Sequence, residues 1–282
     1  MPNLKTALTE AVSLLKNITD TPVLDAEVLL LNVLDKNRSY LRTWSEQELT
    51  PEQHAAYHAL ISNRKSGQPI AYLTGKREFW SRDFNVTPDV LIPRPETELL
   101  IELSLAILPA NQSSRILDLG TGSGIIAVTL AAERPRAQVS AADISPNALQ
   151  VAIDNAKLHH VENIQFYVSN WCENLPHGEF DLILSNPPYI AEDDEHLQQG
   201  DLCFEPKTAL ISPERGLKDI RIIAENSLKR LIPGGCLMVE HGYNQQEEIL
   251  SLFHFFGYKN IKSHTDLSGQ PRVTSGLYLP ST

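Results

Sequence analysis

The chain lacks the features that mark several large classes of protein. Only three of its 282 residues are cysteines, and Cys172, Cys203 and Cys236 are scattered without a Cys-x-x-Cys pair. Because a disulfide framework or a zinc site needs paired cysteines at short spacings, we expect neither, and we predict no metal site. No apolar run approaches the roughly 18 residues of a membrane span, and no signal peptide opens the sequence. We therefore expect a soluble, cytoplasmic protein without membrane contact.

Positive charge is also scarce. The chain has 24 Lys and Arg against 35 Asp and Glu, a formal net charge of −11. Proteins that bind nucleic acid through a basic surface neutralise phosphates with Lys and Arg, and no such cluster is present in the sequence. We expect no direct binding of nucleic acid, because an acidic surface suits a protein partner better than a polyanion.

The first third of the sequence has the pattern of helices. Its apolar positions are Leu4, Leu8, Val12 and Leu15, followed after Pro22 by Leu24, Val28, Leu31 and Val33-Leu34. Thr50-Pro51-Glu52-Gln53 predicts a helix start with a capping box, for a helix that runs to about Lys65. His54 and His58 share a face of that helix, but with no Cys or acidic ligand nearby we expect a solvated face. We assign residues 1–75 to an N-terminal helical domain that docks a partner.

A linker of residues 76–95 separates this region from the rest. Residues 78–86 alternate in polarity and carry aromatic side chains, and Val90-Leu91-Ile92 follows after Pro88-Asp89. Two short strands around a Pro-Asp turn predict a β-hairpin.

From residue 96 to 282, strand and helix patterns alternate. Strands are expected at residues 115–119, 138–143, 164–168, 182–185, 235–240, 258–262 and 273–279. Alternation of this kind implies an α/β domain with a mostly parallel seven-stranded sheet and helices on both faces. The last two strands have no long helix between them, so we expect them to be antiparallel.

One segment of this domain predicts a nucleotide-type site. The strand Ile116-Leu117-Asp118-Leu119 is followed by a glycine-rich turn and an apolar helix, the turn being Gly120, Thr121, Gly122, Ser123 and Gly124. Glycines let a ligand approach the backbone at a helix N-terminus. The spacing Gly-x-Gly-x-Gly differs from the dinucleotide fingerprint Gly-x-Gly-x-x-Gly, which favours S-adenosylmethionine over NAD. The alternative is a turn that only allows close packing of strand on helix.

A second acid supports a bound cofactor. Residues 138–143 predict a short buried strand that ends in Asp143, after which Ser145 can cap a helix with Pro146 in its first turn. Asp143 lies about 20 residues past the glycines, where a carboxylate can accept hydrogen bonds from both ribose hydroxyls. The alternative is an ordinary aspartate at a strand end.

The most informative motif is a proline-stiffened loop after an apolar strand, with the sequence Asn186-Pro187-Pro188-Tyr189. The Asn186 side-chain oxygen and the Pro187 carbonyl can each accept one hydrogen of a planar NH2 group, and the Tyr189 ring can cover its face. Both prolines fix the backbone. The loop therefore predicts substrate binding and catalysis by positioning, although these four residues alone could form an ordinary turn.

The order of these motifs resembles the class I (Rossmann-like) S-adenosylmethionine-dependent methyltransferases. The Asn-Pro-Pro-Tyr-Ile form, the upstream segment Ile92-Pro93-Arg94-Pro95-Glu96-Thr97-Glu98 and the helical N-terminus are similar to the HemK-type enzymes. That family consists of protein-(glutamine-N5) methyltransferases that modify the Gly-Gly-Gln glutamine of peptide-chain release factors. The resemblance covers nearly the whole chain. It implies that a monomeric enzyme uses S-adenosylmethionine, leaves S-adenosylhomocysteine and takes release factors as its protein substrate.

The resemblance also implies further residue roles. Trp171 follows the third strand, where the family contacts adenine, and the Asn186 backbone meets the methionine portion of the cofactor. Arg94 and Glu96 either shape the substrate mouth or form a salt-bridged helix entry. Three other functions stay open: glutamine methylation of a ribosomal protein, adenine-N6 methylation of DNA or RNA on a flipped base, and cofactor binding without turnover.

Overall fold

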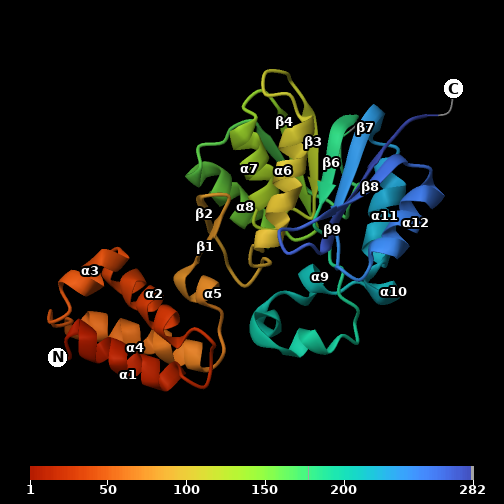
Figure 1. Ribbon diagram of the computed structural model, residues 1–282. Helices are drawn as coiled ribbons and strands as arrows, with labels where there is room; N and C mark the ends of the chain where they lie inside the picture. The colour runs from red at the N-terminus through yellow and green to blue at the C-terminus, as the bar shows by residue number, and fades with distance from the viewer. Residues whose placement is uncertain (177, 281–282) are drawn as a thin grey trace. The chain divides into compact units, whose positions relative to one another are not determined.

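The computed structural model describes residues 1–176 and 178–280, which group into two compact units (Figure 1). Unit 1 comprises Met1–Lys76 together with Gln198–Phe204, and unit 2 comprises Arg77–Leu197 and the chain from Glu205 onward. No helix within the described residues combines the length and apolar character that crossing a membrane would require.

Unit 1 is helical, as the sequence predicts. Its helices are α1 (Leu4–Leu15), α2 (Pro22–Leu34), α3 (Arg38–Thr43), α4 (Pro51–Lys65) and α5 (Ile70–Thr74). The capping box of α4 is present, since Thr50 Oγ1 accepts from Gln53 N at 3.2 Å and Gln53 Oε1 accepts from Thr50 N at 3.0 Å. The apolar face predicted for α2 is partly wrong: Leu24 is 47% exposed, while Ala26, Leu29 and Leu30 are buried.

The second segment of unit 1 comes from far along the chain. Residues 198–204 form the end of a 3-10 turn, η2 (Glu195–Gln198), and a second one, η3 (Gly200–Phe204). The Arg64 guanidinium lies 2.7 Å from Asp25 and 4.0 Å from Asp201. A Cβ on Gly67 would lie 3.2 Å from the Phe204 ring, so the ring packs closely on that glycine.

A β-hairpin is present, but its predicted turn is wrong. The strands are β1 (Lys76–Phe79) and β2 (Arg82–Asn85), and the turn is Trp80-Ser81. Both turn residues have positive φ, 52° and 57°, as a two-residue turn of primed type requires. Their backbone N–H groups donate to Glu98 Oε1 at 2.9 Å and Glu78 Oε1 at 2.7 Å, which stabilises a conformation that these residue types rarely adopt. Residues 90–92 are not a strand.

Unit 2 contains the predicted sheet. Among the described residues its strands are β3 (Arg115–Leu119), β4 (Gln138–Asp143), β5 (Ile164–Val168), β6 (Phe180–Ser185), β7 (Leu231–Glu240), β8 (Lys259–Thr265) and β9 (Pro271–Leu277). They form one seven-stranded sheet in the order β5-β4-β3-β6-β7-β9-β8. The pairs from β5 to β7 are parallel, whereas β9 is antiparallel to both β7 and β8, as predicted.

Helices cover both faces of this sheet (Figure 1). One core packs α6 (Glu98–Ile107), α7 (Ile125–Glu133) and α8 (Pro146–Leu158) on the sheet, and the other packs α11 (Lys218–Ser227) and α12 (Gln246–Phe256). Short helical segments complete the unit: η1 (Pro95–Thr97), α9 (Lys207–Leu210) and α10 (Pro213–Gly216). The class I methyltransferase architecture predicted from the sequence is therefore present.

The strand order of the sheet indicates where the ligand site lies. The chain leaves β3 to build β4 and β5 on one side and returns to build β6 and β7 on the other. In such sheets, ligands bind at the carboxyl ends of the strands where the order reverses. The glycine-rich turn after β3, Asp143 at the end of β4 and Asn186 after β6 all lie at this edge.

Candidate active site

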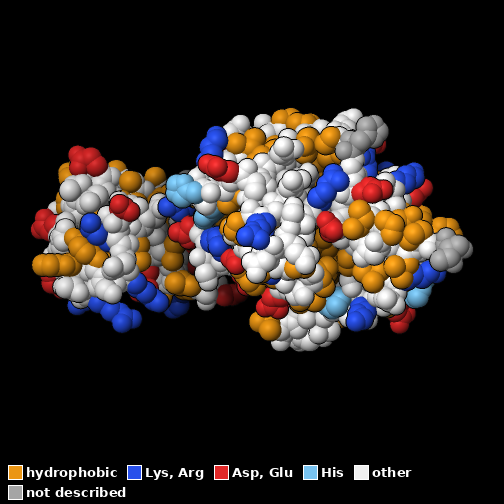
Figure 2. Space-filling model, turned by 90° about the horizontal axis from the view of Figure 1, so that it is seen from above, with side chains coloured by type: hydrophobic (Ala, Val, Ile, Leu, Met, Phe, Trp, Pro, Cys, Tyr) orange, Lys and Arg blue, Asp and Glu red, His pale blue; other side chains and the backbone are white. Residues whose placement is uncertain are grey.

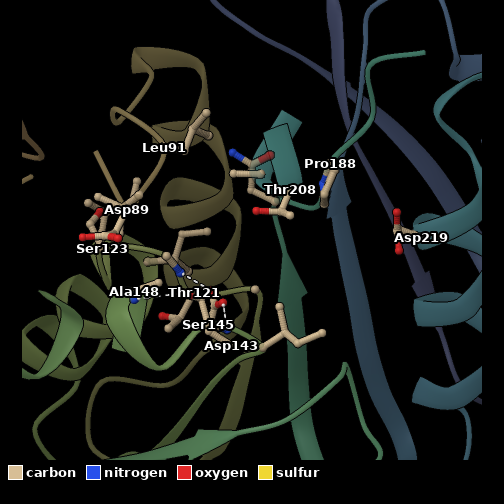
Figure 3. Close-up of a pocket in the computed structure, with 18 of the residues that line it drawn as sticks. Asp89, Leu91, Thr121, Ser123, Asp143, Ser145, Ala148, Pro188, Thr208 and Asp219 are labelled. Carbon is tan, nitrogen blue, oxygen red and sulfur yellow. Dashed lines mark hydrogen bonds between the residues drawn. The ribbon is translucent and has the colours of Figure 1, made fainter. Parts of the chain in front are cut away.

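A cavity of about 330 Å³ opens at these strand ends within unit 2 (Figure 3). This volume lies in the range of small-molecule sites. Residues predicted for the cofactor or substrate that line it are Gly120, Thr121, Gly122, Ser123, Asp143, Trp171, Asn186 and Pro188. Gly124, Pro187 and Tyr189 are not among the lining residues. Figure 3 shows Thr121, Asp143 and Ser145 gathered below Pro188 and Thr208.

The glycine-rich turn is held by the neighbouring strand. The N–H groups of Gly120 and Thr121 both donate to the Ala142 carbonyl, at 2.8 and 2.9 Å. Gly124 has a φ of +82°, and a Cβ there would lie 2.9 Å from Ala152 Cβ. Gly124 therefore allows the start of α7 to pack on α8, which is the packing role that the sequence left open. The turn presents Gly122 and Ser123 to the cavity.

Asp143 joins the two cofactor motifs directly. Its Oδ2 accepts from Gly122 N and its Oδ1 accepts from Ser145 N, both at 2.9 Å. Burial raises the pKa of this carboxyl, and these backbone hydrogen bonds oppose the rise. Ser145 caps α8 by accepting from Ala148 N at 3.2 Å, as predicted. A carboxylate has about four lone-pair sites, more than the backbone N–H groups of Gly122, Ser145 and Ile144 use, so the group can still accept hydrogen bonding from a diol in the cavity.

Trp171 forms a wall of the cavity. Its backbone has a φ of +47°, and its carbonyl accepts from Ser169 Oγ at 2.8 Å. The indole Nε1 donates to Asp219 at 3.2 Å, and the ring lies 3.2 Å from where a Cβ on Gly120 would be. The indole thus lies against the glycine turn, a placement suited to a planar ring bound beside it.

The Asn-Pro-Pro-Tyr loop is anchored at both ends. Before it, the Ser185 hydroxyl donates to the Leu119 carbonyl at 2.7 Å, and Asn186 Nδ2 donates to Thr97 Oγ1 at 3.1 Å. After it, the Tyr189 carbonyl accepts from Gln245 Nε2 at 3.0 Å. The Tyr189 hydroxyl lies 3.5 Å from Glu240 Oε1. The loop is therefore a fixed element whose Asn186 faces the same cavity as Asp143.

Of the two residues Arg94 and Glu96, one lies at the cavity and the other does not. Arg94 lines the cavity and pairs with the buried Glu205 carboxylate at 2.5 Å, while Glu96 does not line it.

On the face shown in Figure 2, Lys and Arg are interspersed with Asp and Glu and form no continuous basic stripe. Within residues 1–176 and 178–280, no group of three or more His, Cys, Asp or Glu is arranged to hold a metal ion.

Sequence reasoning missed several residues at this site. Asp219, Thr97 and Asp89 line the cavity, and the buried Glu240 lies against the loop. Thr97 lies in the segment 92–98, whose resemblance to the HemK-type enzymes could have indicated a role for this residue. Asp219 and Glu240 belong to no local sequence motif. They reach the site through the tertiary packing of α11 and β7, which the sequence alone does not show.

Two carboxyl groups of the site are fully buried and predict a pH dependence of stability. Burial raises the pKa of Asp118 and of Glu240 to about 7, while hydrogen bonds from Thr121 and Thr97, respectively, oppose the rise. Between about pH 4 and pH 7 the native protein therefore holds protons that the unfolded chain has released. The free energy of unfolding should fall as pH rises through this range, by at most about 1.4 kcal/mol per pH unit for each group.

Urea unfolding at several pH values between 4.5 and 7.5 measures this slope. Glu240→Gln should reduce it, because the amide does not titrate, and Glu247→Gln on the exposed face of α12 should leave it unchanged. An equal slope in wild type and Glu240→Gln would contradict the assignment.

Two family models match the chain. The "Methyltransferase small domain" matches residues 96–210, and the "PrmC N-terminal domain" matches residues 6–75. The release factor glutamine methyltransferase of Aliivibrio fischeri is 45% identical over 262 residues, which cover 93% of this chain and 92% of that protein.

Solved structures share the fold. A methyltransferase from Pyrococcus furiosus aligns with a TM-score of 0.54 at 16% identity, covering 79% of this chain and 98% of that one. The T. thermophilus 16S rRNA N2 G1207 methyltransferase, solved with AdoMet and guanosine, aligns with a TM-score of 0.53 at 17% identity, covering 72% of this chain and 49% of that one.

Proposed function

The chain belongs to the release factor glutamine methyltransferases, and from this premise we propose its reaction in atomic terms. A methyl group passes from S-adenosylmethionine to the side-chain amide nitrogen (N5) of the glutamine in a Gly-Gly-Gln motif of a peptide-chain release factor. S-adenosylhomocysteine is the other product. The observation that carries the proposal is that Asn186 lines the same cavity as the glycine turn, Asp143 and Trp171.

The residues of the cavity fit the parts of the methyl donor. Asp143, which holds Gly122 in place by accepting from its N–H, would accept hydrogen bonds from the ribose hydroxyls, and the Trp171 indole would lie against the adenine. The turn at Gly120–Gly124 and the Asn186 backbone would hold the methionine portion. When bound, the sulfonium supplies an electrophilic methyl carbon with a neutral thioether as its leaving group.

The Asn-Pro-Pro-Tyr loop positions the NH2 group of the substrate. Asn186 Oδ1 and the Pro187 carbonyl accept the two hydrogens of the substrate NH2, and the stiff prolines hold both acceptors still. Pro188 and the Tyr189 ring border the amide plane. Orientation of this kind can supply about 7–11 kcal/mol of the barrier reduction, so no strong general base is required. The proton acidified by alkylation leaves to solvent or to a loop carbonyl.

The ribose assignment predicts the effect of removing Asp143. Asp143→Ala should weaken S-adenosylmethionine binding at least about tenfold, because it removes charge-assisted hydrogen bonds worth about 1.5–3 kcal/mol each and releases Gly122. Titration calorimetry measures this, with circular dichroism as the control for folding. Affinity equal to wild type would remove the ribose role.

A labelled-methyl assay tests the substrate class. The enzyme and labelled S-adenosylmethionine are mixed separately with a release factor, with ribosomal proteins and with duplex DNA. The proposal requires label in the release factor. Label only in a ribosomal protein or in DNA would refute this substrate, and label in none would favour cofactor binding without turnover.

The three regions have separate proposed roles: residues 1–75 dock the protein substrate, residues 76–95 link the domains, and residues 96–282 carry the methyltransferase site. Full-length release factor should therefore be methylated far more efficiently than a short Gly-Gly-Gln peptide, measured as kcat/KM. A ratio near one would argue against docking. Because the proposed substrate belongs to the translation apparatus, we expect the enzyme in the cytoplasm. We also expect a monomer, which light scattering can measure.

A further inference from the structure

A buried asparagine on α8 joins the glycine-rich turn to the β-hairpin. Asn155 is 0% exposed, and its Nδ2 donates to the Ser123 carbonyl at 2.8 Å. The same Nδ2 donates to the carbonyl of Asn85, the last residue of β2, at 3.0 Å, and Asn155 Oδ1 accepts from Asn85 N at 2.7 Å. Asn155 is not among the residues that line the cavity, whereas Ser123 is. Any effect of Asn155 on a bound ligand therefore passes through the turn.

The three hydrogen bonds fix the orientation of the Asn155 amide. An asparagine side chain has one carbonyl oxygen and an NH2 group with two hydrogens. The Asn85 N–H can only donate and the two backbone carbonyls can only accept, so each partner has its matching group. The reversed amide would place its oxygen against two carbonyl oxygens. Because no ionisable group takes part, the arrangement does not change with pH.

Asn155 is an unfavourable residue for the inside of a helix, which indicates a tertiary role. Asparagine favours caps and turns, and a buried helix position is usually filled by an apolar residue. On the same face of α8, three positions earlier, Ala152 lies 2.9 Å from where a Cβ on Gly124 would be. This face of α8 therefore supports two successive residues of the turn, Ser123 through a hydrogen bond and Gly124 through close packing.

The β2 strand is held on α8 at a second point. His159 Nε2 donates to the Asp83 carbonyl at 2.9 Å, and the centroid of its ring lies 4.7 Å from that of Phe84. Beyond β2 the chain reaches Asp89, which lines the same cavity as Ser123 (both labelled in Figure 3). The strand that receives the other hydrogen bonds of Asn155 is thus a fixed support.

We propose that Asn155 is a positioning residue for the cofactor, which holds the glycine-rich turn in its binding conformation by fixing the Ser123 carbonyl against β2. The inference rests on the proposed function, which assigns this turn to S-adenosylmethionine. Without the amide, the Ser123 carbonyl loses a buried partner, and the turn has to move to satisfy it. Gly122, whose N–H is bound to Asp143, moves with the turn.

Substitutions of Asn155 test the proposal on the protein with and without cofactor. Asn155→Leu keeps a similar volume and removes every polar contact, so it should weaken S-adenosylmethionine binding at least about tenfold by titration calorimetry. This rise in Kd should exceed any fall in kcat at saturating cofactor. In the ligand-free protein, hydrogen–deuterium exchange over residues 120–124 should be faster than in wild type. Where Asn155→Leu fails to fold by circular dichroism, Asn155→Ser, which can donate to one carbonyl, should show the same changes to a smaller degree.

Asn163 provides a matched control at the other end of α7. Its Nδ2 donates to the carbonyls of Ala131, Arg134 and Ala137 at 3.2, 3.2 and 3.0 Å, and Asn163 is not among the residues that line the cavity. Asn163→Leu should lower the free energy of unfolding and leave both the Kd and the exchange over residues 120–124 unchanged.

Two results would overturn the proposal: a wild-type Kd in the folded Asn155 variant, or an equal rise of the Kd in Asn163→Leu, which would assign the effect to a general loss of stability. Failure of the proposed function is distinct, since wild type would then leave the release factor unmethylated, whereas the comparison of Kd values needs no protein substrate.

Discussion

Asn186→Ala should lower kcat on a release factor by about 10²–10³-fold, the scale observed when one preorganised polar contact to a reacting group is removed. The side chain supplies an acceptor for the reacting NH2, and its own NH2 is already bound to Thr97 at 3.1 Å. The backbone at residue 186 remains in place in the variant. Cofactor affinity should therefore stay within about threefold of wild type, which makes the loss a loss of turnover.

Steady-state kinetics and calorimetry together test this expectation. Asn226→Ala is a matched control, because the Asn226 side chain donates to the Ile222 carbonyl of its own helix, α11, and Asn226 is not among the residues that line the cavity. If Asn186→Ala retained turnover within about twofold of wild type, the Asn-Pro-Pro-Tyr segment would be a structural turn and the proposed chemistry would be wrong.

Gly216→Ala should also cause a large loss of kcat, in this case by displacing the loop. Gly216 has a φ of +85°, and a Cβ there would lie 2.0 Å from the Tyr189 carbonyl oxygen and 2.6 Å from Gln245 Nε2. These two atoms form the hydrogen bond that anchors the end of the loop. The methyl group has to displace the loop, and a displacement of about 1 Å can cost about 100-fold in rate.

Gly234→Ala separates this clash from backbone strain. Gly234 has a similar φ of +88°, but within the described residues no atom beyond its two chain neighbours lies within 4 Å of the position of its Cβ. Both variants should lose thermal stability, and only Gly216→Ala should lose about 100-fold in kcat in the fraction that is folded. Equal kcat values for the two alanine variants would show that the loop does not depend on this contact.

The site could be predicted from the sequence where one short segment contains both the geometry and the chemistry. The glycine-rich turn, Asp143 and the Asn-Pro-Pro-Tyr loop each follow a strand whose apolar run marks it as buried, and parallel strands bring their carboxyl ends to one edge. The predicted strands at residues 115–119, 138–143 and 164–168 agree residue for residue with β3, β4 and β5.

What was missed depends on contacts between distant segments. Gly216 and Glu240 contact the loop because α10 and β7 lie beside it, and nothing in their local sequence shows those contacts. The hairpin turn was missed because Trp80 and Ser81 are not the Asn, Asp or Gly that a two-residue turn with positive φ usually has. Glu98, 18 positions later, stabilises the backbone of Trp80. Likewise, the association of residues 198–204 with unit 1 leaves no periodic signal.

Mass spectrometry of a release factor treated with the enzyme and S-adenosylmethionine tests the central claim most directly. The account predicts a mass increase of one methyl group on the peptide that contains Gly-Gly-Gln, with fragment ions placing it on the glutamine side chain, and no increase with Asn186→Ala. A methyl group on another residue of the release factor, or an unmodified Gly-Gly-Gln peptide beside an active enzyme that methylates a ribosomal protein or adenine, would contradict it.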